Sequence, residues 1–247
     1  MDLLPDQVGA TDGVVIEVTK RCADDLKGRD LGVYRNRKGF FALVAQAIVG
    51  AYCQFLMFEI QWPGATNDCI AFEQSEAIPW LDWLESQNRG WLPGDDAYSA
   101  VHKCVCSPFS KKQLRNARTE IPLTYYKMRA FNHVLSSRRI TVERAFGILI
   151  RRWGCLWSAP ERRDRECLLM IIVCVKLHNI CVARWRSRNP SSRIPEVPAH
   201  VDVPIEVDAQ DEEILDRLEN KFKGLARKSA QNYIRLQFVD RIYECGV

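Results

Sequence analysis

The chain has 247 residues, of which 47% are hydrophobic, 35 are Lys or Arg and 31 are Asp or Glu, giving a net charge of +4. This length and composition allow one large domain with a substantial core and exclude a wholly disordered protein. So small a net charge does not by itself indicate a protein that binds nucleic acid.

The first part of the chain is dominated by patterns that predict β-strands. Residues 8–18 predict a buried strand, because β-branched residues follow an Asp-Gly pair. A basic, turn-like loop lies at residues 34–39. The apolar runs 40–51 and 54–62 have the length of strands and are separated by a short connection, which predicts a hairpin.

Between residues 68 and 120 the pattern is mixed. Residues 68–85 have apolar side chains at helical spacing, interrupted by Pro79, and residues 90–94 predict a short strand that leads to Asp95. Residues 100–120 are polar and basic, which favours a loop. We expect residues from about 100 to 130 to be a helical or loop insertion that precedes the next helix.

The second half predicts helices at residues 125–157 and 164–185. Four prolines and several serines indicate a linker at residues 187–210, which becomes acidic toward its end. Residues 211–247 predict an amphipathic helical tail. Strands before residue 96 and helices after it predict an α/β fold, a mixed sheet flanked by helices, in a domain of residues 1–186.

The ten cysteines form no CxxC pair and no Cys/His pattern with zinc-finger spacing, which argues against a structural zinc site. Cys167, Cys174 and Cys181 fall in an apolar helical pattern and are expected to be small core residues. There is no charged-then-apolar signal at the N-terminus, and the longest apolar run, Cys167–Val175, is too short to cross a bilayer. We therefore expect a reducing intracellular compartment and no membrane association.

Three acidic residues occupy unusual positions in this pattern. Asp12 lies in an apolar strand, Asp95 ends a short strand, and Glu143 lies beside the apolar face of a helix. Carboxylates in such surroundings repel one another when they are brought together, unless a divalent cation compensates their charge. Mg²⁺ prefers oxygen ligands, and two such ions can activate a water and stabilise a leaving oxygen.

Each acid also has an ordinary structural interpretation. Asp12 precedes a glycine and suits a turn, and Asp95 suits the position that caps a helix. Glu143 lies four residues after Arg139, which is the spacing of a helical ion pair. Asp68 by itself is typical of a helix cap. Individually, the residues leave these alternatives open.

Six sequence blocks follow one another along the chain. They are Asp12-Gly13, Tyr34-Arg35-Asn36-Arg37-Lys38-Gly39, Pro63-Gly64-Ala65-Thr66-Asn67-Asp68, Gly94-Asp95-Asp96-Ala97-Tyr98, Glu143-Arg144-Ala145-Phe146-Gly147 and Leu177-His178-Asn179. In this order, and over about residues 9–185, the chain closely resembles the PIF/Harbinger superfamily of DDE transposases. The 47 residues between Asp95 and Glu143 fall within the spacing of that superfamily.

The resemblance implies an RNase H-like fold and a DDE endonuclease. Asp12, Asp95 and Glu143 match the catalytic, metal-binding triad, and Asp68 matches a further acidic position of the metal site. The implied cofactor is Mg²⁺ or Mn²⁺, as two ions, and the implied reaction is hydrolysis of DNA phosphodiester bonds followed by strand transfer. The chain departs from the family pattern at Asn67, where His is usual, and in the residues that follow Asp12 and Asp95.

Partners are implied as well. Relatives carry a helix-turn-helix-like DNA-binding region before the first catalytic strand, whereas here that strand begins by about residue 8. Family members often act with a separate Myb-like DNA-binding protein. We therefore expect DNA, such a protein and a second copy of the chain as partners, and the nucleus, with the cytoplasm second, as the location.

Two basic groups are candidates for contact with the DNA backbone. From Arg138 to Arg165 there are eight Arg and three acids, whereas residues 202–219 are rich in acids. Ion pairs and a solvated surface are the alternative for both groups. The loop group is Arg35, Arg37 and Lys38, and the helix group is Arg138, Arg139, Arg144, Arg151 and Arg152.

Two other functions remain open. A domesticated, catalytically silent transposase-derived module that binds DNA or proteins in the nucleus has the same sequence pattern. An unrelated α/β enzyme whose acids are structural has less support, because the chain lacks a Gly-rich phosphate loop, a GxSxG elbow and an HExxH motif.

Overall fold

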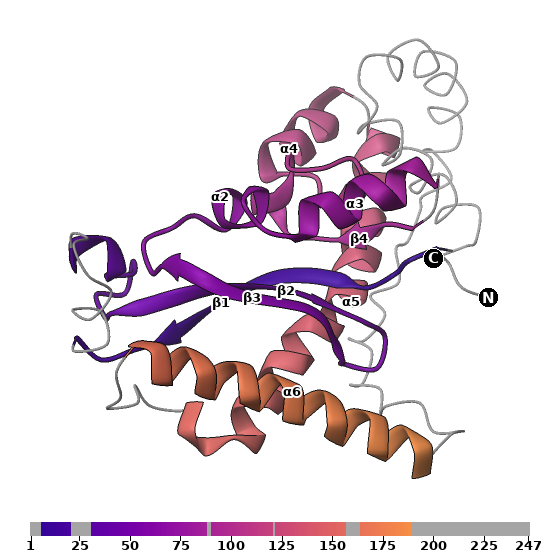
Figure 1. The fold of residues 1–247 in the computed structure, drawn as a ribbon. Helices are drawn as coiled ribbons and strands as arrows, with labels where there is room; N and C mark the ends of the chain where they lie inside the picture. The colour runs from indigo at the N-terminus through magenta and orange to yellow at the C-terminus, as the bar shows by residue number, and fades with distance from the viewer. Residues whose placement is uncertain (1–5, 21–30, 88–89, 121, 157–163, 189–247) are drawn as a thin grey trace.

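The computed structural model describes residues 6–20, 31–87, 90–120, 122–156 and 164–188 (Figure 1). The linker at 187–210, apart from its first two residues, and the tail at 211–247 lie outside the described residues. The strands are β1 (Ala10–Glu17), β2 (Ala42–Val49), β3 (Phe55–Pro63), β4 (Leu92–Pro93) and β5 (Val105–Cys106). The helices are η1 (Leu31–Tyr34), α2 (Asp68–Glu73), α3 (Ala77–Ser86), η2 (Asp96–Tyr98), α4 (Lys111–Glu120), α5 (Pro122–Arg152), η3 (Gly154–Leu156) and α6 (Asp164–Arg188).

The strands form antiparallel and parallel pairs. β1, β2 and β3 make an antiparallel sheet with β2 in the middle, and β4 pairs with β5 in parallel. A parallel bridge between Gln7 and Trp91 connects the two, and the N–H of Val8 donates to the carbonyl of Trp91 at 3.1 Å. The start of β1 therefore lies beside β4, and the predicted mixed α/β fold is confirmed.

Helices cover both faces of the three-stranded sheet, with α2 and α3 on one side and α6 on the other (Figure 1). The side chains of β2 alternate between the two layers, as the pleat requires. Ile48 packs with Phe72 of α2 and Leu81 of α3, whereas Ala47 and Val49 pack in the layer formed by α5 and α6. This explains why every residue of β2 is buried.

The C-terminal end of α6 is attached to the turn between β2 and β3 by hydrogen bonds to backbone atoms. The side chain of Asn179 accepts the N–H of Phe55 and donates to its carbonyl, both at 2.8 Å. Nε2 of the buried His178 lies 2.8 Å from the carbonyl of Cys53. We call Cys53, Phe55, His178 and Asn179 the turn clamp. The last of the six sequence blocks thus has a structural role.

Helix α6 also has an apolar outer face. Over Glu166–Arg188 it is long and apolar enough, by length and composition, to cross a membrane, and 33% of its most apolar stretch is buried in the structure. A helix that packs on a core passes the same test, so the absence of membrane association stays a prediction. Its exposed large apolar residues are Leu169, Ile172, Val173, Leu177, Ile180 and Trp185.

The structure corrects several sequence-based expectations. Residues 100–120 are not a loop throughout, because they contain β5 and α4. The break in the region 68–85 lies between α2 and α3, before Pro79. Pro79 is the third residue of α3, where its missing N–H leaves no helical bond unmade. Cys181 is half-buried and not a core residue, unlike Cys167 and Cys174.

Candidate active site

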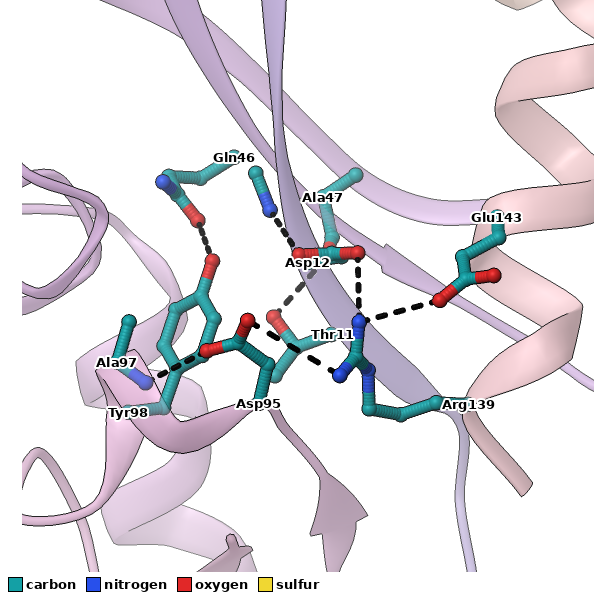
Figure 2. Close-up of polar contacts among 10 residues, drawn as sticks. Thr11, Asp12, Gln46, Ala47, Asp95, Ala97, Tyr98, Arg139 and Glu143 are labelled. Carbon is teal, nitrogen blue, oxygen red and sulfur yellow. Dashed lines mark hydrogen bonds and ion pairs between the residues drawn. The ribbon is translucent and has the colours of Figure 1, made fainter. Parts of the chain in front are cut away.

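Asp12 lies in the middle of β1, opposite Ala47 of β2. Paired residues of antiparallel strands point to the same side, so Asp12 faces the layer that contains α5. Its Oδ1 accepts the N–H of Gly13 at 3.0 Å. A carboxylate is thereby held at the sheet surface, with its second oxygen turned toward α5 (Figure 2).

Asp95 follows β4 and caps the short helix η2, since its Oδ1 accepts the N–H of Ala97. The structural interpretation of Asp95 as a cap is therefore correct. It does not conflict with a role in the site, because Oδ2 remains available and lies 4.0 Å from Nη1 of Arg139.

Glu143 is carried by the long helix α5, whose apolar face packs on the sheet. Val142 and Phe146, on either side of Glu143 in the sequence, are buried with Ala10 of β1. This packing places Glu143 at the border between core and solvent, with 59% of its side chain exposed. Its Oε1 lies 3.2 Å from Nη2 of Arg139, one helical turn earlier.

The three acids meet at Arg139 (Figure 2). Nη2 of Arg139 also donates to Oδ2 of Asp12 at 3.2 Å, so one guanidinium contacts Asp12, Asp95 and Glu143. The helical ion pair expected from the spacing is present, but it is part of a larger group. We call these four residues the carboxylate cluster.

Asp68 lies against the other side of β1. Asn67 caps α2 by accepting the N–H of Cys69 at 2.9 Å, which leaves Asp68 as the first helical residue. A Cβ atom added at Gly13 would lie 2.5 Å from Oδ1 of Asp68 and 2.9 Å from Nε2 of Gln46. The glycine thus allows Asp68 to approach the strand that carries Asp12.

Gln46 and Tyr98 form a buried polar contact next to the acids that the sequence did not reveal. The hydroxyl of Tyr98 donates to Oε1 of Gln46 at 2.8 Å, and both side chains are fully buried. Nε2 of Gln46 lies 3.5 Å from Oδ1 of Asp68. The detectable signal was a single polar residue within the otherwise apolar run of β2.

The charges in this region are incompletely compensated. Burial raises the pKa of Asp12 to about 6, although Arg139 and the N–H of Gly13 lower it. Burial also raises the pKa of Asp68, and the charge of Asp95 adds to this rise. The pKa of Tyr98 is raised by burial and then by the charges of Asp12, Asp68 and Asp95. These four groups therefore lie within electrostatic reach of one another.

This donor set fits a divalent cation. Three carboxylates contact one guanidinium and a fourth, that of Asp68, is close enough to Asp95 to feel its charge, so the site carries excess negative charge in partly buried surroundings. Carboxylate oxygens are the ligands that Mg²⁺ and Mn²⁺ prefer. Asp12, Asp95 and Glu143 could together hold such an ion, since they contact the same guanidinium. The charge of Asp95 also raises the pKa of Asp68.

The candidate DNA-binding residues lie in different parts of the structure. Arg37 is exposed and its charge lowers the pKa of Asp68, so it lies on the site side, as does Arg139. Arg144 and Arg152 lie instead near the turn clamp, where the charge of Arg144 lowers the pKa of Cys53 and that of Arg152 lowers the pKa of His178. The structure does not bring this second pair to the carboxylate cluster.

The other candidate DNA-binding residues differ in their surroundings. The guanidinium of Arg35 lies 5.5 Å from the ring centre of Phe41. Lys38 is exposed, and its N–H donates to the side chain of Asn36 at 2.8 Å. Arg138 is half-buried, and Arg151 is exposed in the last turn of α5.

A second group with metal-ligand chemistry, Asp82, Glu85 and His102, lies between α3 and the segment before β5. Nδ1 of His102 accepts the N–H of Cys104 at 3.1 Å, and Nε2 lies 3.1 Å from Oδ1 of Asp82. Lys103 also neutralises Glu85, at 2.7 Å. The contacts describe a surface ion-pair network.

Comparisons with known proteins identify the family of the chain. The family model described as DDE superfamily endonuclease matches residues 11–179, which is more than half of the chain. The chain is also similar to the Bos taurus protein named "Putative nuclease HARBI1", with 24% identity over 184 residues that cover 72% of this chain and 46% of that protein. It thus spans about half the length of that relative. No solved structure matches the chain.

The matched region begins one residue before Asp12 and ends at Asn179, so it includes the carboxylate cluster and the turn clamp. The resemblance to Harbinger-type transposases is confirmed by the family and by the similarity to a nuclease derived from one. The chain belongs to the DDE superfamily of endonucleases.

Proposed function

We propose that the chain is a divalent-metal-dependent endonuclease that hydrolyses DNA phosphodiester bonds at an RNase H-like DDE site and performs strand transfer of the transposase type. The observation that carries the proposal is the convergence of Asp12, Asp95 and Glu143 on a single cationic group. These residues lie on β1, after β4 and on α5, which are the positions that the family resemblance implies.

In this proposal each acid has a distinct task. Asp12, fixed by the N–H of Gly13, and Asp95, fixed by the N–H of Ala97, bind Mg²⁺ or Mn²⁺. Glu143 is the most exposed of the three and completes the metal site toward the substrate. Asp68 binds a second ion together with Asp95. The bound ions supply a polarised phosphate and an activated water.

The DNA backbone is proposed to bind beside the acids. Arg37, whose charge reaches Asp68, is the best placed of the basic residues for this contact. Arg35, Lys38, Arg138 and Arg151 are further candidates for this contact, whereas the charges of Arg144 and Arg152 reach Cys53 and His178 of the turn clamp. Binding to phosphates predicts an affinity that falls steeply with salt. A Myb-like protein, a second copy of the chain and a nuclear location are proposed on the family resemblance alone.

Cleavage of supercoiled plasmid DNA tests the proposal. We expect nicking in Mg²⁺ or Mn²⁺ and none in a chelator. Asp95→Asn and Glu143→Gln are expected to reduce the rate on the order of 10³-fold or more, because each removes a metal ligand. Lys176→Gln, an exposed change on α6, is the control and should cleave normally.

The silent, domesticated module is the alternative. The observation that favours it is Arg139, which already compensates part of the charge of the acids. Folded protein that cleaves neither single-stranded nor double-stranded DNA in Mg²⁺, Mn²⁺ or Co²⁺ contradicts the enzyme and supports this module.

A further inference from the structure

The carboxylate cluster contains a cation supplied by the chain itself. Nη2 of Arg139 lies 3.2 Å from Asp12 and 3.2 Å from Glu143, and Nη1 lies 4.0 Å from Asp95. The side chain is only 19% exposed (Figure 2). A guanidinium therefore occupies the space between the three acids that we assign to metal binding.

The contacts of Arg139 differ from those of a strong arginine–carboxylate ion pair. A strong arginine–carboxylate pair has two parallel N–H bonds to one carboxylate. Here a single nitrogen is shared by two different carboxylates, and the contact with Asp95 is long. Nε of Arg139 is buried and has no hydrogen-bond partner among the described residues. Arg139 thus compensates all three acids in part and none of them fully.

One positive charge also cannot balance three negative charges. A divalent cation on the same oxygens compensates more charge at shorter range, but it is repelled by a guanidinium a few ångströms away. Arg139 and the metal ion are therefore competitors for the same acids.

We propose that Arg139 is an internal counter-ion that holds the metal-free carboxylate cluster together and leaves it when a divalent cation binds. The inference rests on the proposed function, since it takes Asp12, Asp95 and Glu143 as the metal ligands. Arg139 is one helical turn from Glu143 on α5, so rotation of its long side chain releases Asp12 and Asp95 without movement of the helix.

The competition has two opposite consequences. Without metal, Arg139 reduces the repulsion among the acids, so it stabilises the fold. With metal, the contacts of Arg139 must be broken first, so it lowers the apparent affinity for the ion. A residue that only bound DNA, or only supported the site structurally, would not combine these effects.

Calorimetric titration of the full chain with Mn²⁺ tests the inference, together with melting temperatures in chelator and in Mn²⁺. We expect Arg139→Gln to bind Mn²⁺ roughly tenfold more tightly than the unaltered chain, which corresponds to about 1.4 kcal/mol. Its melting temperature should be lower in chelator and should rise more on addition of Mn²⁺. Lys176→Gln removes the same charge from α6 and should change neither quantity.

Arg139→Lys is the second variant and decides the matter if Arg139→Gln does not fold. Lysine keeps the charge but, as a compact ammonium, cannot bridge three carboxylates. Its Mn²⁺ affinity should lie between those of the unaltered chain and the glutamine variant, above the former.

The outcomes separate the two proposals. Equal or weaker Mn²⁺ binding by the Arg139 variants overturns the counter-ion role and leaves the metal site standing. Absence of Mn²⁺ binding by folded unaltered chain and variants alike overturns the proposed function, and the counter-ion role with it.

Discussion

The carboxylate cluster and the turn clamp solve the same structural problem in different ways. Each joins segments far apart in the chain: Arg139 meets Asp12 across 127 positions, and Asn179 meets Phe55 across 124. In the clamp, the side chain of Asn179 makes two 2.8 Å hydrogen bonds with neutral backbone groups. In the cluster, charges are left partly uncompensated.

The difference separates a region built for stability from one built for binding. Satisfied polar groups contribute to stability, whereas a partly buried carboxylate with a raised pKa costs stability in the absence of a ligand. Sites that bind ions or substrates commonly carry such a cost. Loss of a clamp side chain should therefore lower stability, whereas neutralisation of an acid of the carboxylate cluster should raise it.

Asn179→Ala is expected to have the largest effect on stability. It leaves the N–H and the carbonyl of Phe55 without their side-chain partners, so the free energy of unfolding should fall by about 2–4 kcal/mol. Urea denaturation measures the change. Lys176→Ala, on the exposed side of the same helix, should alter it by less than about 0.5 kcal/mol. Equal effects of the two substitutions contradict the clamp.

Asp12→Asn should act in the opposite direction. The pKa of Asp12 is raised to about 6, so its ionised form is disfavoured in the metal-free fold at neutral pH. Removal of that charge should increase the free energy of unfolding by about 1–3 kcal/mol. Urea denaturation in chelator at pH 7 measures it. A loss of stability would show that Asp12 is fully compensated by Arg139.

Gly13→Ala tests the close approach of Asp68 to β1. Its Cβ would lie 2.5 Å from Oδ1 of Asp68, so the carboxylate must move. We expect a loss of stability of about 1 kcal/mol and weaker Mn²⁺ binding, by severalfold. Calorimetry separates the two effects. Unchanged Mn²⁺ affinity would exclude Asp68 from the metal ligands.

The smallest expected effect is the pH dependence that arises from His178. Burial lowers the pKa of His178 below its ordinary value of 6.5, so the unfolded chain takes up a proton more readily than the folded one. Stability is therefore lost as the pH falls below about 6.5, with a slope of at most about 1.4 kcal/mol per pH unit. Urea denaturation between pH 7.5 and 5.5 measures this slope.

The opposite contribution of Asp12 must be removed from that measurement. Because the pKa of Asp12 is raised in the fold, the folded chain takes up a proton there first, and its stability increases as the pH falls through about 6. The comparison is therefore best made between Asp12→Asn and the double variant with His178→Gln. A slope that is the same in both proteins would mean that His178 does not contribute.

The convergence of the three acids could be predicted from the sequence, because both their apolar surroundings and their spacing were unusual. Asp12, Asp95 and Glu143 were chosen from their settings and from the family pattern, and the structure brings them together. Their catalytic role stays a prediction. The strands and the two long helices were predicted because their apolar periodicity is strong. Helix α4 was predicted only as a helical or loop insertion, because just two of its residues, Leu114 and Ala117, are apolar and pack on the core.

The role of Arg139 could not be read from the sequence. Its spacing to Glu143 indicated a local ion pair, which is present, but the contacts with Asp12 and Asp95 depend on the packing of α5 across β1. Gln46 was equally hidden, since its partner Tyr98 lies 52 positions away. Local patterns carry no information about such long-range pairs.

The distance in sequence between β1 and α5 has a consequence for how the protein folds. The β1–β3 meander is made of neighbouring segments, so its contact order is low and it can form early. The contact between Asp12 and Arg139 closes a loop of more than a hundred residues, and the entropy of that closure delays it. We therefore expect the acids to come together only after the meander has formed, in the later stages of folding.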